Sequence, residues 1–327
     1  MGFWEDFTNW LRSLFGGAAE PEEPAGRTPA PVYLKVALII FDPPVPSQGG
    51  RPLSQVLGWS DSEILVSGYI SDLQASSHGY VNYQIAETIH APAFPVKADG
   101  FVYDADDYVR FWQNGRGFHM PDMVDYHQIL ADFDLVEKVN SNQIDEVWLM
   151  AMPYAGFYES IMAGPGAFFC NAPPLTVTSA NRRFIVMGFN YQRGVGEMLE
   201  SFGHRAESIL RQVFRNSRGD DNLWARFIRY EQTSPGMAEC GTVHFAPNST
   251  RDYEWGNLTP VWCRSRNWVG FPNLEGAPVK LNCAEWGNGD IRAHHTWWLK
   301  LLPHVAGQAD GIRYNWWSYL IDPNEVH

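Results

Sequence analysis

The sequence has few cysteines, few basic residues and no long apolar run. Its four cysteines among 327 residues include no C-x-x-C pair, so the usual zinc-ribbon and thioredoxin spacings are absent. The 24 Lys and Arg residues oppose 37 Asp and Glu residues, and the net charge of -13 disfavours nucleic-acid binding. No apolar run reaches the ~18 residues of a membrane-spanning helix, and the first residues do not resemble a secretory signal. We therefore expect a soluble, acidic, globular protein, and a cytoplasmic location is favoured.

Tryptophan is unusually frequent. Most of the 14 tryptophans lie between Trp224 and Trp317. One interpretation is a large aromatic core in a region with little regular structure. The other is a platform on which sugar rings or other flat ligands stack, with Trp297 as the candidate binding residue. Three of the four cysteines, which can form a disulfide or remain buried thiols, lie in the same region: Cys240, Cys263 and Cys283.

The region 1–15 is predicted to contain a short amphipathic helix, 3–15, because Phe3, Phe7 and Trp10 recur on one face. The stretch 16–31, rich in Gly, Ala, Glu and Pro, is typical of a flexible linker. The apolar face of the helix must be buried, and we expect it to dock on protein, either on its own domain or on a partner. An anionic membrane is the least favoured surface because acidic residues outnumber basic ones in this helix.

The region 32–222 alternates between strand and helix patterns. Predicted strands span 33–41, 80–85, 144–150 and 183–189, and predicted helices span 62–75, 126–139 and 195–214. Apolar strands that alternate with helices are typical of an α/β fold. We expect a layered, mostly parallel sheet with helices on both faces. The Trp- and Gly-rich region 223–327 is predicted to be an irregular elaboration packed on this α/β domain.

Three loops follow predicted strands at the carboxyl edge of such a sheet, where ligands bind in open α/β folds. They span 42–50, 153–171 and 190–197. The middle loop is long and aromatic, and long loops in compact domains are usually functional or disordered. The third loop enters a helix through Gly194 and Gly196, which fits either an anion site or an ordinary strand-to-helix turn. We expect the functional site at this edge.

The predicted helix 195–214 carries the strongest chemical constellation. Glu200, His204 and Glu207 are four and three residues apart, so their side chains can converge on one point. One histidine with two carboxylates suits a divalent metal, or a histidine held by a carboxylate for proton transfer. The alternative is a solvated helix face stabilised by i,i+4 pairs. The site interpretation requires the region 223–327 to cover that face.

The C-terminal region supplies further histidines. His244 lies in a strand-like stretch, and His294 and His295 are adjacent. Adjacent side chains point in different directions, so at most one of this pair serves a single site. His244 with His295 or His294, joined to His204 and a glutamate, completes a candidate set of three or four ligands for a divalent metal, with zinc as the first candidate. For each histidine, the alternative is a core residue held by one hydrogen bond.

Other candidate residues belong to the expected cleft. Glu159, in the long loop, is the acid best placed to pair with a glutamate of the helix 195–214, and two such carboxylates would also suit glycoside hydrolysis. Asn171 is a candidate donor to an oxyanion beside Cys170, although the aromatic neighbours of Cys170 favour a buried, inert thiol. Two arginines are candidates to hold an anionic group of a substrate: Arg193 and Arg292.

These features predict a hydrolase with a metal- or carboxylate-dependent Glu/His site at the carboxyl edge of the sheet, acting on a polar, glycan- or peptide-like substrate. The candidate catalytic residues are Glu159, Glu200 and Glu207, the candidate metal ligands are His204, His244 and His295, and the candidate substrate-binding residues are Asn171, Arg193, Arg292 and Trp297. The alternative is a non-catalytic protein that binds a glycan or peptide, or an assembly protein docked through the helix 3–15.

Overall fold

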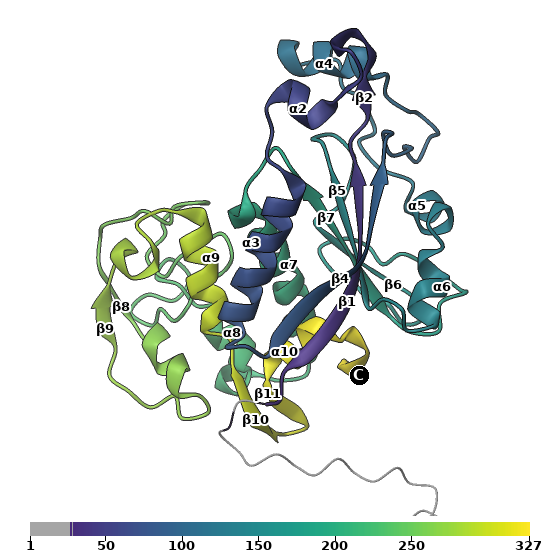
Figure 1. Ribbon diagram of the computed structural model, residues 1–327. Helices are drawn as coiled ribbons and strands as arrows, with labels where there is room; N and C mark the ends of the chain where they lie inside the picture. The colour runs from purple at the N-terminus through teal and green to yellow at the C-terminus, as the bar shows by residue number, and fades with distance from the viewer. Residues whose placement is uncertain (1–26, 28) are drawn as a thin grey trace, which may run out of the picture.

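The computed structural model describes residue 27 and residues 29–327. The predicted helix 3–15 and most of the predicted linker 16–31 lie outside the described residues. Figure 1 shows the described chain, in which a central sheet and its helices are followed by a C-terminal region in green and yellow.

A five-stranded sheet forms the centre of the molecule (Figure 1). Its strand order is β4 (Val81–Ala91), β1 (Val32–Phe41), β5 (Glu146–Ala151), β7 (Phe184–Asn190) and β6 (Ser160–Ala163). The first four strands are parallel, and β6 runs antiparallel to β7. Every residue of β5 and β6 is buried, which explains why such segments are apolar without alternation. The α/β prediction is confirmed at the level of a mixed, mostly parallel sheet with helices. Their layering on both faces, the irregular C-terminal elaboration and the domain boundaries stay predictions.

Two long helices follow their predicted spans, and one prediction fails. Helices α3 (Ser62–Ser76) and α7 (Val195–Val213) end within one residue of the predicted ranges. The single helix expected over 126–139 is wrong, because the chain forms α5 (Tyr126–Asp132) and α6 (Leu135–Asn140) instead. Asp134 between them has a φ of 53°, a left-handed conformation that cannot continue a right-handed helix.

The remaining elements are short. The helices are α2 (Leu53–Leu57), α4 (Ala105–Asn114), α8 (Leu223–Phe227), α9 (Ile291–Lys300) and α10 (Trp316–Ile321). The strands pair as β2 (Pro44–Val45) with β3 (Arg51–Pro52), β8 (Val261–Cys263) with β9 (Val279–Leu281), and β10 (His304–Ala309) with β11 (Ile312–Asn315).

Strand β6 lies within the stretch expected to be one long loop. The loop before β6 crosses β7 closely, since a Cβ at Gly188 would collide with the backbone carbonyl of Tyr158. Glycine is therefore required at position 188 for this approach. The consequence for the site is that the backbone of Glu159, directly before β6, is held against β7, because its carbonyl oxygen accepts a 3.1 Å hydrogen bond from the Gly188 amide.

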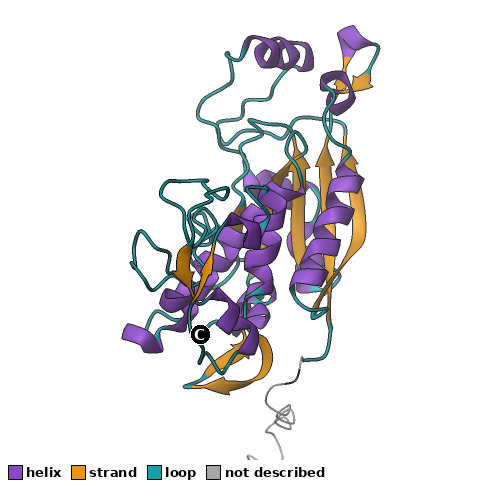
Figure 2. Cartoon of the chain, turned by 90° about the vertical axis from the view of Figure 1, so that its left-hand side faces the viewer, coloured by secondary structure: helices purple, strands orange, loops and turns teal. Residues whose placement is uncertain are grey.

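The region 223–327 buries most of its tryptophans. Five are at most 1% exposed: Trp268, Trp286, Trp298, Trp316 and Trp317. Trp262 is half exposed. These exposures favour the aromatic-core interpretation for most of the tryptophans. Figure 2, which turns this side of the molecule toward the viewer, shows long loops joining its short helices and hairpins.

Helices α7 and α9 approach each other closely at Gly196. A Cβ at this position would lie 2.5 Å from Ile291 Cγ2 and 3.0 Å from the backbone nitrogen of Arg292. We expect Gly196→Ala to lower the free energy of unfolding by about 1–2 kcal/mol, because overpacking outweighs the gain in helix propensity. Denaturant unfolding measures the change, with Gly270→Ala as the control because a Cβ at Gly270 meets nothing within 4 Å. An unchanged unfolding midpoint for Gly196→Ala would contradict this packing.

Candidate functional site

A cluster of histidines and carboxylates lies on one face of α7. The helix starts shortly after β7, so its first turns stand at the carboxyl edge of the sheet. Glu200, His204 and Glu207 project from successive turns, and His244 reaches them from the region 223–327. Glu200 is only 4% exposed. This face of α7 is therefore not the solvated helix face of the alternative interpretation.

Three of these residues place ligand atoms around one point. His204 Nε2 lies 3.0 Å from His244 Nε2, and His244 Nε2 lies 3.1 Å from Glu200 Oε1. The third separation, from His204 Nε2 to Glu200 Oε1, is 4.0 Å. A tetrahedral zinc ion with bonds of about 2.0–2.1 Å would hold its ligand atoms about 3.3 Å apart. Glu200, His204 and His244 therefore have the chemistry and approximate spacing of a divalent-metal site.

A carboxylate holds each histidine by its other ring nitrogen. His204 Nδ1 lies 3.1 Å from Glu207 Oε2, and His244 Nδ1 lies 3.0 Å from Asp252 Oδ1. The second oxygen of Glu207 accepts a hydrogen bond from the Val243 amide. A carboxylate at Nδ1 favours the tautomer that leaves a lone pair on Nε2. The two Nε2 lone pairs then face each other, an arrangement that a metal ion or a proton between them stabilises.

The same contacts shift the pKa values of the cluster. Burial raises the pKa of Glu200, but hydrogen bonds from the protonated His244 imidazole and from Tyr253 outweigh it and lower the pKa overall. Burial lowers the pKa of His204, but Glu207 outweighs it and raises the pKa overall. The hydrogen bond to Glu200 raises the pKa of His244. The cluster therefore favours an ionised glutamate and positive charge between the histidines.

Glu159 faces this cluster from the loop before β6. Its Oε2 lies 3.9 Å from His204 Nε2 and accepts a 2.5 Å hydrogen bond from Asn171 Nδ2. The backbone amide of Asn171 donates to Ser208 Oγ on α7, which fixes the Asn171 backbone against the helix. The Glu159 side chain is 35% exposed, whereas that of Glu200 is 5% exposed. Glu159 is thus a carboxylate of the cluster that solvent reaches.

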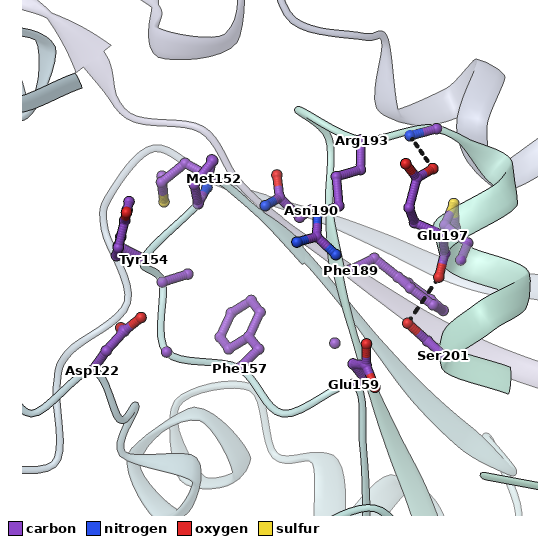
Figure 3. Close-up of a pocket in the computed structure, with 16 residues that line it drawn as sticks. Asp122, Met152, Tyr154, Phe157, Glu159, Phe189, Asn190, Arg193, Glu197 and Ser201 are labelled. Atoms are coloured by element: carbon purple, nitrogen blue, oxygen red, sulfur yellow. Dashed lines mark hydrogen bonds between the residues drawn. The ribbon is translucent and has the colours of Figure 1, made fainter. Parts of the chain in front are cut away.

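A pocket of about 270 Å³ adjoins the cluster at Glu159 (Figure 3). It is formed by the residues that follow β5 and β7 and by the first turns of α7, which is the predicted edge of the sheet. Its wall includes Met152, Phe157 and Phe189, and Arg193 also lines it. Among the described residues, Glu159 is the one carboxylate that lines this pocket and also approaches His204.

Besides Asn171, which contacts Glu159, three predicted site residues lie outside both the pocket and the cluster of Glu200, His204, Glu207 and His244. Arg292 forms a 2.6 Å ion pair with Asp72, which joins α9 to α3. Trp297 packs on another tryptophan of the C-terminal region. His295 Nε2 lies 3.2 Å from the carbonyl oxygen of Val243, and burial lowers the pKa of His295 to about 4. His295 therefore occupies the alternative role, that of a core histidine held by one hydrogen bond.

The cysteines and the glycine-containing helix start have structural explanations. All four cysteines are free and buried, and burial raises the pKa of Cys170 to about 11, so its thiol is a poor nucleophile near neutral pH. At the start of α7, the Gly194 amide donates to Glu197 Oε2 at 3.0 Å. The chain's own carboxylate thus takes the position of an anion there.

Sequence reasoning missed Asp252 and Tyr253. Asp252 contacts His244, and the Tyr253 hydroxyl donates to Glu200 Oε1 at 2.9 Å. The Tyr253 ring also lies against the His244 imidazole. The one weak indication in the sequence is that this Asp-Tyr pair follows a few residues after His244. That spacing alone does not predict that either side chain contacts the cluster.

No family model matches the chain, no curated protein matches its sequence and no solved structure matches its fold. Any functional assignment therefore depends on the chemistry of the site itself. Within residues 29–327, no helix is both long enough and apolar enough to cross a bilayer.

Proposed function

We propose that this chain is a divalent-metal-dependent hydrolase, with zinc as the first candidate metal, that cleaves amide or ester bonds in polar, peptide-like substrates. The observation that supports this most strongly is the convergence of Glu200, His204 and His244, with a carboxylate behind each imidazole. Two histidines and one carboxylate form a common ligand set of catalytic zinc sites, which keep a further position open. A bound zinc ion would polarise a carbonyl group and acidify a water molecule.

In this proposal Glu159 is the general base. A general base must lie within hydrogen-bond reach of the proton it accepts, and Glu159 is the carboxylate that borders both the cluster and the pocket. Asn171 positions the Glu159 carboxylate through its 2.5 Å hydrogen bond. Glu200 acts as a ligand, and Glu207 positions His204, so both take roles other than acid–base catalysis.

A peptide-like substrate is favoured over a glycan. Most glycosidases place two available carboxylates on either side of the scissile bond. Here Glu200 is nearly buried and is engaged by His244 and Tyr253. The other two carboxylates that line the pocket, Asp122 and Glu197, are held by Lys97 and by the Gly194 amide. The aromatic rings of Phe157 and Phe189 offer apolar surface to a side chain of the substrate.

We expect Glu159→Gln to lower kcat by about a hundredfold or more while zinc stoichiometry is unchanged, because a positioned general base contributes about 10²–10⁴-fold. The measurement is amine release by the zinc-loaded full chain from a panel of N-acylated amino acids and dipeptides. Glu275→Gln is the matched control, since Glu275 is exposed and lies outside the pocket.

Three results would contradict this proposal. If the zinc-loaded wild type released no amine from any member of the panel, a non-catalytic binding protein would be the better description. If Glu159→Gln were as active as the wild type, the assignment of Glu159 as the base would be wrong. If Glu159→Gln lost its zinc, Glu159 would be a zinc ligand and not the general base.

A further inference from the structure

Each charged side chain that lines the pocket has a hydrogen-bond partner, with one exception. Four charged side chains line it: Asp122, Glu159, Arg193 and Glu197. The three carboxylates each accept a hydrogen bond, Asp122 from Lys97 at 2.6 Å, Glu159 from Asn171 at 2.5 Å and Glu197 from the Gly194 amide at 3.0 Å. Each carboxylate in the pocket therefore already has a hydrogen-bond donor from the protein.

Arg193 is the exception. Its side chain is exposed and forms no hydrogen bond or ion pair with any other residue in the described part of the chain. Figure 3 shows its guanidinium directed toward the middle of the pocket. The Arg193 backbone amide donates to the Asn190 carbonyl at 3.1 Å, so the turn that carries the side chain is held in place. An arginine whose backbone is held in place and whose guanidinium has no partner is available to bind an anionic group of a ligand.

We infer that Arg193 binds the free carboxylate of the substrate, so that the protein takes N-acylated amino acids or the carboxyl-terminal residue of a peptide. This inference rests on the proposed hydrolase function. A guanidinium matches a carboxylate with two parallel hydrogen bonds. The pocket, at about 270 Å³, is at the small end of ligand pockets and suits one terminal residue better than the interior of a long chain.

A carboxylate fits this pocket better than a phosphate ester does. Both anions form bidentate contacts with arginine. The pocket, however, contains the three carboxylates of Asp122, Glu159 and Glu197, whose field repels a dianion more strongly than a monoanion. The protein as a whole carries a net charge of -13, which acts in the same direction.

The reaction that follows is a hydrolysis with balanced atoms. Glu159 takes a proton from water, the oxygen of that water forms a bond to the acyl carbon, and the C–N bond breaks. The amine leaves with the proton that Glu159 accepted, and the acyl group leaves as a carboxylic acid. Arg193 contacts the carboxylate beside the leaving amine and takes part in no bond change.

Binding of matched ligands to the metal-free full chain tests this inference without requiring catalysis. The probes are N-acetyl-L-phenylalanine, its uncharged primary amide and phenyl phosphate, measured by calorimetry or by NMR titration. We expect the acid to bind at least about tenfold more tightly than the amide, because a hydrogen-bonded charge pair is worth more than a neutral one. Arg193→Met should abolish this preference, and Arg193→Lys should retain part of it. Arg211→Met, which removes an exposed arginine of α7 outside the pocket, should leave the preference unchanged.

Several outcomes would overturn the inference. Arg193 does not bind a substrate carboxylate if the acid and the amide bind with equal affinity, or if the acid does not bind at millimolar concentration. An unchanged preference for the acid in Arg193→Met would show the same. Tighter binding of phenyl phosphate than of the acid would assign the pocket to phosphate esters instead. Because these titrations use metal-free protein, failure of the metal site would leave the preference for the acid intact, and the two failures are distinguishable.

Discussion

Replacing His204 by alanine is expected to weaken zinc binding by about a thousandfold. Structural zinc in zinc-finger peptides binds with apparent free energies of about 10–16 kcal/mol, or about 3–4 kcal/mol for each of four ligands. His204 Nε2 is one of the three converging atoms, and its loss leaves Glu200 and His244 as a pair. Calorimetric titration of the metal-free full chain with zinc measures the change.

Two further variants make the His204 experiment specific. His127→Ala removes an exposed histidine of α5 outside the cluster and should leave zinc affinity unchanged. Glu207→Gln removes the charge behind His204 Nδ1 but no ligand atom, and outer carboxylates of this kind are worth about 10–100-fold in affinity. The expected order of zinc affinity is therefore wild type, then Glu207→Gln, then His204→Ala. Equal affinity of the wild type and His204→Ala would contradict the proposed ligand set.

Replacing Arg205 by alanine is expected to lower the free energy of unfolding by about 3–5 kcal/mol, because it leaves a buried carboxylate without its counter-ion. Arg205 projects from α7 to the sheet side and pairs with Glu146 of β5 at 2.5 Å, with side chains 0% and 2% exposed. Burial alone would lower the pKa of Arg205, but Glu146 outweighs it and raises the pKa. Arg205 also donates to the carbonyl of Leu320 on α10.

A double variant separates the ion pair from its surroundings. Glu146 accepts a hydrogen bond from Tyr83 at 2.8 Å through one oxygen and from Trp148 at 3.2 Å through the other. Glutamine at position 146 keeps an acceptor for Trp148, and its amide nitrogen can donate to the Tyr83 hydroxyl. We expect Arg205→Met with Glu146→Gln to be more stable than Arg205→Met alone, because no unpaired charge remains in the core. Urea unfolding of the four proteins of this cycle gives the coupling energy. A coupling near zero would show that the pair does not act as a unit.

The face of α7 was predictable because its information is local. Glu200, His204 and Glu207 share one face by helical periodicity alone, and α7 was expected nearly at its observed span. The approach of His244 was expected on weaker grounds, since no spacing along the chain links it to His204. Its position follows from the fold of the region 223–327, which brings its imidazole within 3.0 Å of His204.

Other features depend on contacts that sequence patterns do not encode. Arg292 was expected near a substrate, but an aspartate of α3 neutralises it across the helix interface. Asp252 and Tyr253 join the cluster from a loop without periodicity, so no local rule places them. The break between α5 and α6 depends on the left-handed conformation of Asp134, which an aspartate tolerates but does not require. In each case a tertiary contact or a single backbone choice decided the outcome.

The most direct test of the metal site is an anomalous-difference map, recorded at the zinc edge, from crystals of the full chain grown with zinc. The account predicts one dominant peak about 2.0–2.1 Å from the Nε2 atoms of His204 and His244 and beside the Glu200 carboxylate. Crystals that hold zinc elsewhere but show no peak among these three side chains would contradict the account.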